Sequence, residues 1–134
     1  MIQKQISVFL ENKPGKLSKF VSLLAENKID LSALSIAETQ DYGILRIIVD
    51  QPEKTAEFLR ANNWPCKLTE VLAVTVPDEA GSLTKILAVL ADAGMSLAYS
   101  YAFFSRQQGH ACIVLRVEDN ARARKLLNEA GIIC

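Results

Sequence analysis

The chain of 134 residues lacks several features that define other classes of protein. Its three cysteines are odd in number and have neither disulfide-framework nor zinc-ligand spacing. No apolar run approaches the roughly 18 residues that a membrane span needs, and the first residues lack the basic and apolar regions of a signal peptide. These absences predict a protein of the reducing cytoplasm without a membrane partner.

Neither sign of charge dominates, because 15 basic residues balance 15 acidic ones. Arg122, Arg124 and Lys125 stand close to Glu118 and Asp119 in the sequence, as on a solvated helix surface. Nucleic-acid binding depends on a clustered basic surface that releases counterions from phosphates. The sequence therefore predicts no nucleic-acid partner.

Groups that could carry out catalysis are scarce. The only histidine is His110, and no serine or cysteine stands in a recognisable arrangement with a base. Asp78 and Glu79 are adjacent in sequence, so their side chains should diverge, which suits capping better than acid–base chemistry. Phosphate-loop and dinucleotide-binding glycine motifs are missing, as is CxxC spacing. We expect a protein that is not an enzyme and needs no cofactor or metal.

The chain contains one pattern twice. Gly15 and Gly81 lie 66 positions apart, and the residues around them match at that spacing. After Gly43 the spacing grows to 68, so Val49 corresponds to Val117 and the loop near residues 106–109 is about two residues longer than its counterpart. Repetition over such a length indicates a duplicated structural unit. We expect two modules, residues 1–70 and 71–134.

Each copy predicts the order strand, helix, strand, strand, helix. Apolar residues alternate at Ile6, Val8 and Leu10, as in a half-buried strand, and then recur at helical spacing from Leu17 to Leu24. The later elements of the first copy are expected to be strands at 31–38 and 44–49, a turn at 40–43 and a helix at 53–61. Those of the second copy are strands at 96–105 and 111–117, a turn at 106–109 and a helix at 120–130.

The fourth strand differs between the copies. In the first copy, residues 66–70 are expected to form it and to run directly into the first strand of the second copy at 71–76. Only residues 132–134 remain for the second copy, so either its sheet has a short edge or another segment completes it. The order βαββαβ predicts an α+β fold of two tandem ferredoxin-like modules, each an antiparallel sheet with helices on one face.

The two turns between first strand and first helix are the candidate ligand site. Gly15 and Gly81 allow a sharp turn and leave the amides at a helix start uncovered, where a carboxylate is favoured. Asn12 and Asp78 stand three residues earlier and could accept hydrogen bonds from an ammonium group. The same residue types are also common helix caps without any ligand, so capping is the alternative interpretation.

Each copy has a strand, then the motif Asn/Asp-x-Pro/Ala-Gly-x-Leu, then a helix and two further strands. Two such copies resemble tandem ACT domains over nearly the whole chain. The resemblance implies a stand-alone regulatory protein that binds a free amino acid where the helix-start loop of one module faces the second strand of another. The implicated residues of the first copy are Asn12, Pro14, Gly15, Leu17, Leu34, Ser35 and Ile36. Those of the second copy are Asp78, Ala80, Gly81, Leu83, Ser100, Tyr101 and Ala102.

The two copies of this motif are not identical. Ala80 stands where the family usually has proline, and Asn12 replaces aspartate, so the two sites are expected to differ in affinity. We favour the Asp78 loop because charge-assisted hydrogen bonds are the stronger ones. Tyr99, Tyr101 and Phe103 should share one face of a strand, either packing within the fold or forming an aromatic wall for the ligand.

The expected assembly follows from the same pattern. Both sheets have edges to cover, so a homodimer is expected. The ligand-bound arrangement is expected to regulate either a metabolic enzyme or another copy of this protein. The alternative function is a protein–protein interaction module that acts through its sheet edges without a ligand.

Overall fold

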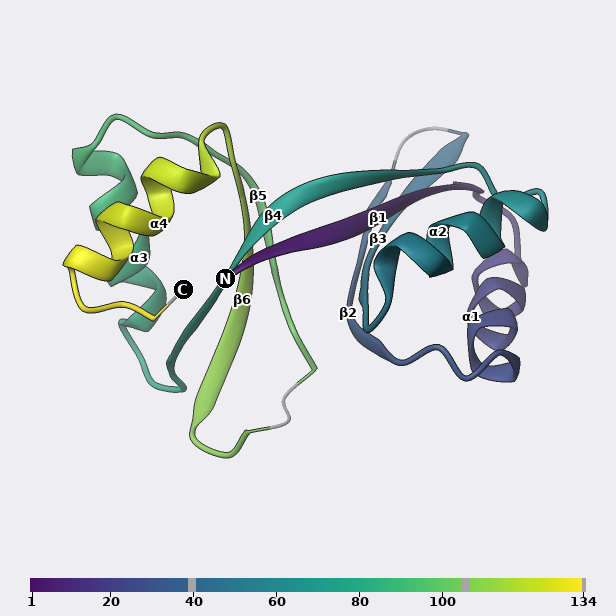
Figure 1. Ribbon diagram of the computed structural model, residues 1–134, viewed down its shortest axis with the longest axis horizontal. Helices are drawn as coiled ribbons and strands as arrows, with labels where there is room; N and C mark the ends of the chain where they lie inside the picture. Colours follow the sequence, from purple (N-terminus) through teal and green to yellow (C-terminus); the bar gives the residue numbers. More distant parts are fainter. Residues whose placement is uncertain (39–40, 105–106, 134) are drawn as a thin grey trace. The chain divides into compact units, whose positions relative to one another are not determined.

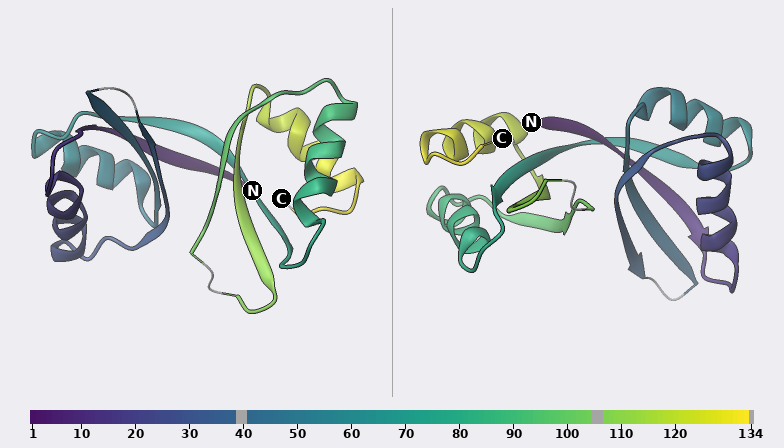
Figure 2. Two further views of the ribbon diagram at one scale, coloured as in Figure 1. Left: turned by 180° about the vertical axis from the view of Figure 1, so that it is seen from behind. Right: turned by 90° about the horizontal axis from the view of Figure 1, so that it is seen from below.

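The computed structural model describes residues 1–38, 41–104 and 107–133, and it divides into two compact units. The N-terminal unit is Lys4–Thr69. The C-terminal unit is Glu70–Cys134 together with Met1–Gln3. In each unit two helices lie on one face of antiparallel strands, as Figure 1 and the two further views of Figure 2 show. The predicted α+β class, with two ferredoxin-like modules, is confirmed.

The strands of the N-terminal unit follow the order β2-β3-β1-β4. Its elements are β1 (Ile2–Glu11), α1 (Lys16–Glu26), β2 (Leu31–Glu38), β3 (Tyr42–Val49) and α2 (Pro52–Ala61), followed by the first residues of β4 (Cys66–Pro77). In the register of β1 against β3, Val8 lies opposite Leu45 and Leu10 opposite Gly43. β3 therefore separates β1 from β2.

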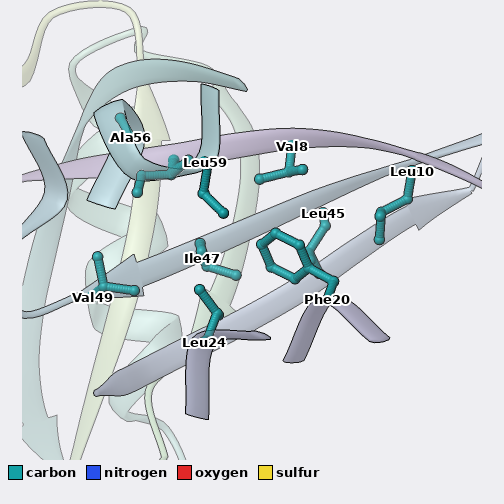
Figure 3. Packing of buried hydrophobic residues seen from close by; sticks show 10 residues of the cluster. Val8, Leu10, Phe20, Leu24, Leu45, Ile47, Val49, Ala56 and Leu59 are labelled. Carbon is teal, nitrogen blue, oxygen red and sulfur yellow. The ribbon is translucent and has the colours of Figure 1, made fainter. Parts of the chain in front are cut away.

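The alternating apolar residues of β1 and β3 point toward the helices and form the core of this unit. Figure 3 shows Val8, Leu45 and Ile47 packed against Phe20 of α1 and Leu59 of α2. All five side chains are fully buried. Burying a side chain of this size stabilises the fold by about 1.5–3 kcal/mol, so the 3.6- and 2-residue periods of the sequence fix which face of each element turns inward.

The C-terminal unit repeats this layout with the strand order β4-β6-β5. Its further elements are α3 (Ser82–Asp92), β5 (Leu97–Ala102), β6 (His110–Val117) and α4 (Asn120–Glu129). Leu72, Val74, Ile86, Leu115 and Leu127 are the main fully buried residues of its core. α4 begins at the N-cap Asp119, whose Oδ1 accepts a hydrogen bond of 3.0 Å from the Arg122 N–H.

β4 is one continuous strand of 12 residues, which confirms that the fourth strand of the first copy runs directly into the first strand of the second. In the C-terminal unit both ends of the chain lie along it. The Met1 amino group and carbonyl bond the Ala73 carbonyl and N–H at 2.9 and 2.7 Å, and the Thr75 N–H donates to the Ile133 carbonyl at 3.0 Å. In the second copy, the place of the missing fourth strand is therefore taken by two segments, residues 1–3 and the region of Ile133. The part played by residues 1–3 could not be predicted from the repeat.

The duplication extends to the backbone. Gly15 and Gly81 have φ angles of 85° and 93°, and at the other end of the first helix Lys28 and Gly94 have 54° and 69°. Lys28 is a non-glycine residue in the left-handed region, which shows that the fold imposes this geometry even where the sequence supplies no glycine. The equivalent strand–helix loops, hairpins and helix ends confirm the repeat.

Some predicted boundaries differ from the structure. Tyr42 and Gly43 already belong to β3 and not to the expected turn, because they pair with Glu11 and Leu10. β5 starts at Leu97 and ends at Ala102, inside the expected 96–105. The remaining positions of those predictions, Gln40, Ser105, Arg106 and Cys134, lie outside the described residues. Among the helices of the described ranges, none has the length and apolarity to cross a membrane. The module limits 1–70 and 71–134 stay a prediction.

Candidate functional site

The two strand–helix loops share one backbone conformation. Gly15 caps α1 and Gly81 caps α3, each in the left-handed region with ψ of −12°. A Cβ atom at either glycine would meet no heavy atom within 4 Å, so the space in front of each loop is open. At both positions an L-residue would be strained, which explains why glycine stands there twice.

The loops leave amide donors without partners. An α-helix cannot satisfy its first N–H groups internally, and no side chain caps either helix here. In the first turn of α3, Leu83 and Thr84 donate to no residue of the described chain, and Leu17 and Ser18 of α1 behave alike. Each loop therefore presents two free donors at the positive end of a helix, an arrangement that attracts a carboxylate.

Asn12 and Asp78 do not cap these helices, so the capping alternative is wrong for both. Each is tied through its backbone instead: the Asn12 N–H donates to the Asp41 carbonyl at 3.3 Å and the Asp78 N–H to the Gly109 carbonyl at 2.9 Å. Their side chains are exposed and make no hydrogen bond or ion pair within the described residues. Both remain available as acceptors.

The other predicted loop residues lie at different depths. Pro14 and Ala80 are exposed. Leu17 packs against the core of its unit, whereas the equivalent Leu83 leaves 46% of its surface exposed. The two loops thus share a backbone and differ in the apolar surface beside it.

The predicted strand residues occupy β2 and β5. Leu34 packs on the N-terminal core, Ser35 lies opposite Arg46, and Ile36 is 48% exposed. In the C-terminal unit the residues of this set are Ser100, Tyr101 and Ala102, of which Ser100 donates its hydroxyl proton to the Val114 carbonyl at 2.9 Å. Within one unit a strand separates these residues from the loop, so the pairing of a loop with the second strand of another module stays a prediction.

Tyr99 and Tyr101 share one face of β5, as alternation predicted. Their rings stack with centroids 6.4 Å apart and planes inclined by 17°. The alternatives of packing within the fold and of a wall against a ligand both remain open.

The groups considered for catalysis or metal binding include His110 and the cysteines Cys66 and Cys112. His110 is exposed at the start of β6, and within the described ranges no three metal-ligating side chains converge. Partial burial raises the pKa of the Cys66 and Cys112 thiols, which disfavours their reactive thiolate forms at neutral pH.

The residues on either side of each loop, Glu11 and Lys16 or Pro77 and Ser82, line a cavity that the sequence did not reveal. In the N-terminal unit it measures about 250 Å³ and lies among Phe9, Glu11, Lys16, Tyr42 and residues 63–65. In the C-terminal unit a cavity of about 320 Å³ occupies the equivalent place. The sequence feature that could have indicated the first cavity is the pair of aromatic residues Phe9 and Tyr42 near the ends of two strands. The alternation of apolar residues by itself places such side chains on the solvent-facing side of the sheet.

Comparisons with known proteins agree with this architecture. A family model described as "ACT domain pair" matches residues 1–132. A protein of solved structure from Bacteroides thetaiotaomicron is 36% identical and superposes with a TM-score of 0.91, covering 99% of this chain and 91% of that protein. Among curated proteins, none matches significantly.

Two more distant structures share the fold. The regulatory subunit of aspartate kinase from Thermus thermophilus, in a ligand-free form, superposes with a TM-score of 0.67 at 14% identity, covering 97% of this chain and 95% of that one. The corresponding subunit from Thermus flavus gives 0.62 at 13% identity, covering 98% and 95%.

Proposed function

Because the chain belongs to the family of ACT domain pairs, we propose that it is a regulatory protein that binds a free amino acid and carries out no chemistry of its own. The observation that supports the proposal best is the recurrence of one loop in both units. In each loop two amide donors at a helix start, without partners among the residues that the structure describes, stand close in sequence to an acceptor side chain that forms no bond with those residues.

The loop chemistry complements the two ends of an amino acid. The carboxylate is bound by the amides of Leu83 and Thr84 in α3, where the helix dipole adds about 0.3–1 kcal/mol. The ammonium group is bound by the Asp78 carboxylate, and a hydrogen bond of this charge-assisted kind contributes about 1.5–3 kcal/mol. The Asn12 loop offers a neutral acceptor, so we expect the Asp78 loop to bind more tightly.

Strand residues complete the proposed site as they do in the family. Residues 34–36 and 100–102 are the candidates, presented to a loop by a paired module in the assembly. A ligand that bridges two modules favours one mutual arrangement in proportion to its differential affinity for it. A homodimer provides such pairs of modules.

We further propose that a metabolic enzyme responds to this arrangement in the cytoplasm. The structures from the two Thermus species are regulatory subunits of aspartate kinase, which supports an enzyme as the regulated partner without identifying it. The competing function, a protein-binding module that acts through a sheet edge such as β5, requires no ligand.

A thermal-shift screen against the twenty amino acids tests the proposal. A ligand that binds only the folded state at a hundred times its Kd stabilises it by about 2.7 kcal/mol and raises the melting temperature. We expect one amino acid or one chemical group of them to do so. A bulky residue at Gly81 should abolish the shift from binding at the Asp78 loop, and bulky residues at both Gly15 and Gly81 should abolish it altogether. If no amino acid changes the melting temperature, the amino-acid sensor is wrong and the ligand-free alternative is favoured.

A further inference from the structure

The cavity beside the first loop has the size of a single small metabolite. Its volume of about 250 Å³ lies below the range of about 300–1,000 Å³ typical of drug-sized ligands. Glu11 and Lys16, which flank the loop of residues 12–15 in sequence, both line it. The cavity is therefore lined by the residues on either side of the first loop, and the free amides of Leu17 and Ser18 follow Lys16 directly in sequence.

The same hollow recurs in the C-terminal unit at equivalent positions. Its lining includes the counterparts of all seven residues: Thr75, Pro77, Ser82, His110 and residues 131–133. The backbone bond that closes it recurs too, from the Phe9 N–H to the Pro65 carbonyl at 3.4 Å and from the Thr75 N–H to the Ile133 carbonyl at 3.0 Å. At none of these seven equivalent positions do the two linings have the same residue type, so the backbone of the fold creates the cavity and the side chains set its chemistry.

Three of the seven residues that line the N-terminal cavity are aromatic. Phe9, Tyr42 and Trp64 stand where the other unit has threonine, histidine and isoleucine. Phe9 and Tyr42 leave 52% and 56% of their surfaces exposed, while Trp64 is half-buried and held edge-on against Phe20 at 5.1 Å. Aromatic rings prefer offset or edge-to-face partners, so this lining favours a flat ring over a small aliphatic chain.

Opposite charges lie at the same cavity. Lys16 and Glu11 both line it, and Glu11 is paired with Lys13 at 3.0 Å on the exposed surface. Lys13 and, less strongly, Lys16 lower the pKa of the Glu11 carboxyl, which stays ionised at neutral pH. Because an exposed ion pair contributes little, Glu11 can exchange Lys13 for a ligand ammonium group at small cost.

We infer that this cavity receives the ring of an aromatic amino acid, whose ammonium and carboxylate groups meet Glu11, Lys16 and the adjacent loop amides. The inference rests on the proposed function and adds a side-chain class to the first loop. The C-terminal cavity, lined by Thr75, His110 and Ile132, lacks the rings and does not select aromatic ligands.

Trp64 supplies a direct probe because it is the only tryptophan of the chain. L-phenylalanine does not absorb at the red edge of the tryptophan band, so a titration followed by selectively excited Trp64 emission reports on the cavity itself. We expect a saturable change in emission with L-phenylalanine and none with L-alanine at the same concentrations. No saturable change with phenylalanine, or an equal response to alanine, overturns the inference.

Replacing cavity residues of the N-terminal unit by the residues at the equivalent positions of the C-terminal unit tests the role of the rings in ligand binding. Phe9→Thr and Tyr42→His install residues that the equivalent backbone already carries, at exposed positions where folding should persist. Each is expected to weaken phenylalanine binding on the order of tenfold, since one ring contact is lost. His110→Gln, at the position equivalent to Tyr42, is expected to leave the affinity unchanged.

The outcomes separate this inference from the proposed function. If calorimetry shows that phenylalanine binds equally well to Phe9→Thr, Tyr42→His and wild type, the cavity assignment is overturned and the amino-acid sensor stands. A Trp64 response that survives disruption of both the Gly15 and Gly81 loops contradicts binding by the loops, and with it the contact between the ligand carboxylate and the loop amides that is inferred here.

Discussion

Replacing Gly81 with aspartate separates ligand binding from folding. The new carboxylate would lie at the start of α3, beside the amides of Leu83 and Thr84 to which we assign the ligand carboxylate. Charge-assisted hydrogen bonds contribute about 1.5–3 kcal/mol each, so losing two of them corresponds to at least about 100-fold weaker binding at the Asp78 loop.

The same change should cost little stability. Gly81 has a φ of 93°, and a left-handed L-residue costs about 1–2 kcal/mol, less for aspartate, which tolerates this region. A negative charge at a helix N-terminus stabilises the helix by about 0.3–1 kcal/mol. The new Cβ atom at Gly81 would have no heavy atom within 4 Å, so it causes no clash. We expect the free energy of unfolding to fall by about 1 kcal/mol or less.

Gly94→Asp is the matched control, because Gly94 has a φ of 69°, equally open surroundings and a place just beyond the other end of α3. It adds the same charge and a similar backbone strain, and should leave the affinity unchanged. Isothermal titration calorimetry with the amino acid found by thermal shift measures all three proteins. Since the first loop is the second candidate, Gly15→Asp and the double variant belong to the series. Wild-type affinity in the Gly15→Asp/Gly81→Asp double variant would refute the reasoning.

Further predictions concern the core, the helix caps, a surface carboxylate and the thiols. Leu59→Ala and Leu127→Ala remove equivalent, fully buried side chains and should each lower the free energy of unfolding by about 2–5 kcal/mol in denaturant titrations; a loss below about 1 kcal/mol would contradict the core assignment. Asp119→Ala removes the N-cap of α4 and should lower the free energy of unfolding by about 1 kcal/mol. Gln51→Asp, at the equivalent uncapped start of α2, should raise the free energy of unfolding. A gain from Asp119→Ala or a loss from Gln51→Asp would contradict this interpretation of the two helix starts. The hydrogen bond from Lys4 lowers the pKa of Glu53. This pair therefore stabilises the fold above the pH at which an unfolded glutamate titrates, and the contribution is lost as the pH falls through the lowered pKa. Lys4→Gln should raise the Glu53 pKa in an NMR titration, and an unchanged value would disprove the pairing. Cys66 and Cys112 should react more slowly with a thiol reagent at neutral pH in the native than in the unfolded protein, as peptide mapping can show, and equal rates would contradict their burial.

The repeat made most of the fold predictable from the sequence. The spacing of Gly15 and Gly81 identified two equivalent helix starts, and the alternation at Ile6, Val8 and Leu10 identified the buried face of β1. The continuous strand β4 followed from the absence of any linker between residues 66 and 77. These features depend on local backbone chemistry and on periodicity, which a sequence displays directly.

Other features depend on which segments meet in space, which periodicity does not encode. Met1 belongs with β4 because Ala73 offers it a free edge, although residues 1–3 continue β1 without a break in pattern. The hairpin at Tyr42 extends further than expected because Glu11 supplies a pairing partner. The cavity at Phe9 and Trp64 joins residues 55 positions apart, so only the folded chain reveals it.

A crystal structure of the protein with the amino acid that produces the largest thermal shift tests the central claim most directly. We predict a ligand carboxylate oxygen about 2.7–3.2 Å from backbone nitrogens in the first turn of α1 or α3. The ammonium group should lie at the side chain of Asp78 in the second loop, or of Asn12 or Glu11 at the first. An ordered ligand bound elsewhere, with both loops free of it, would contradict the account.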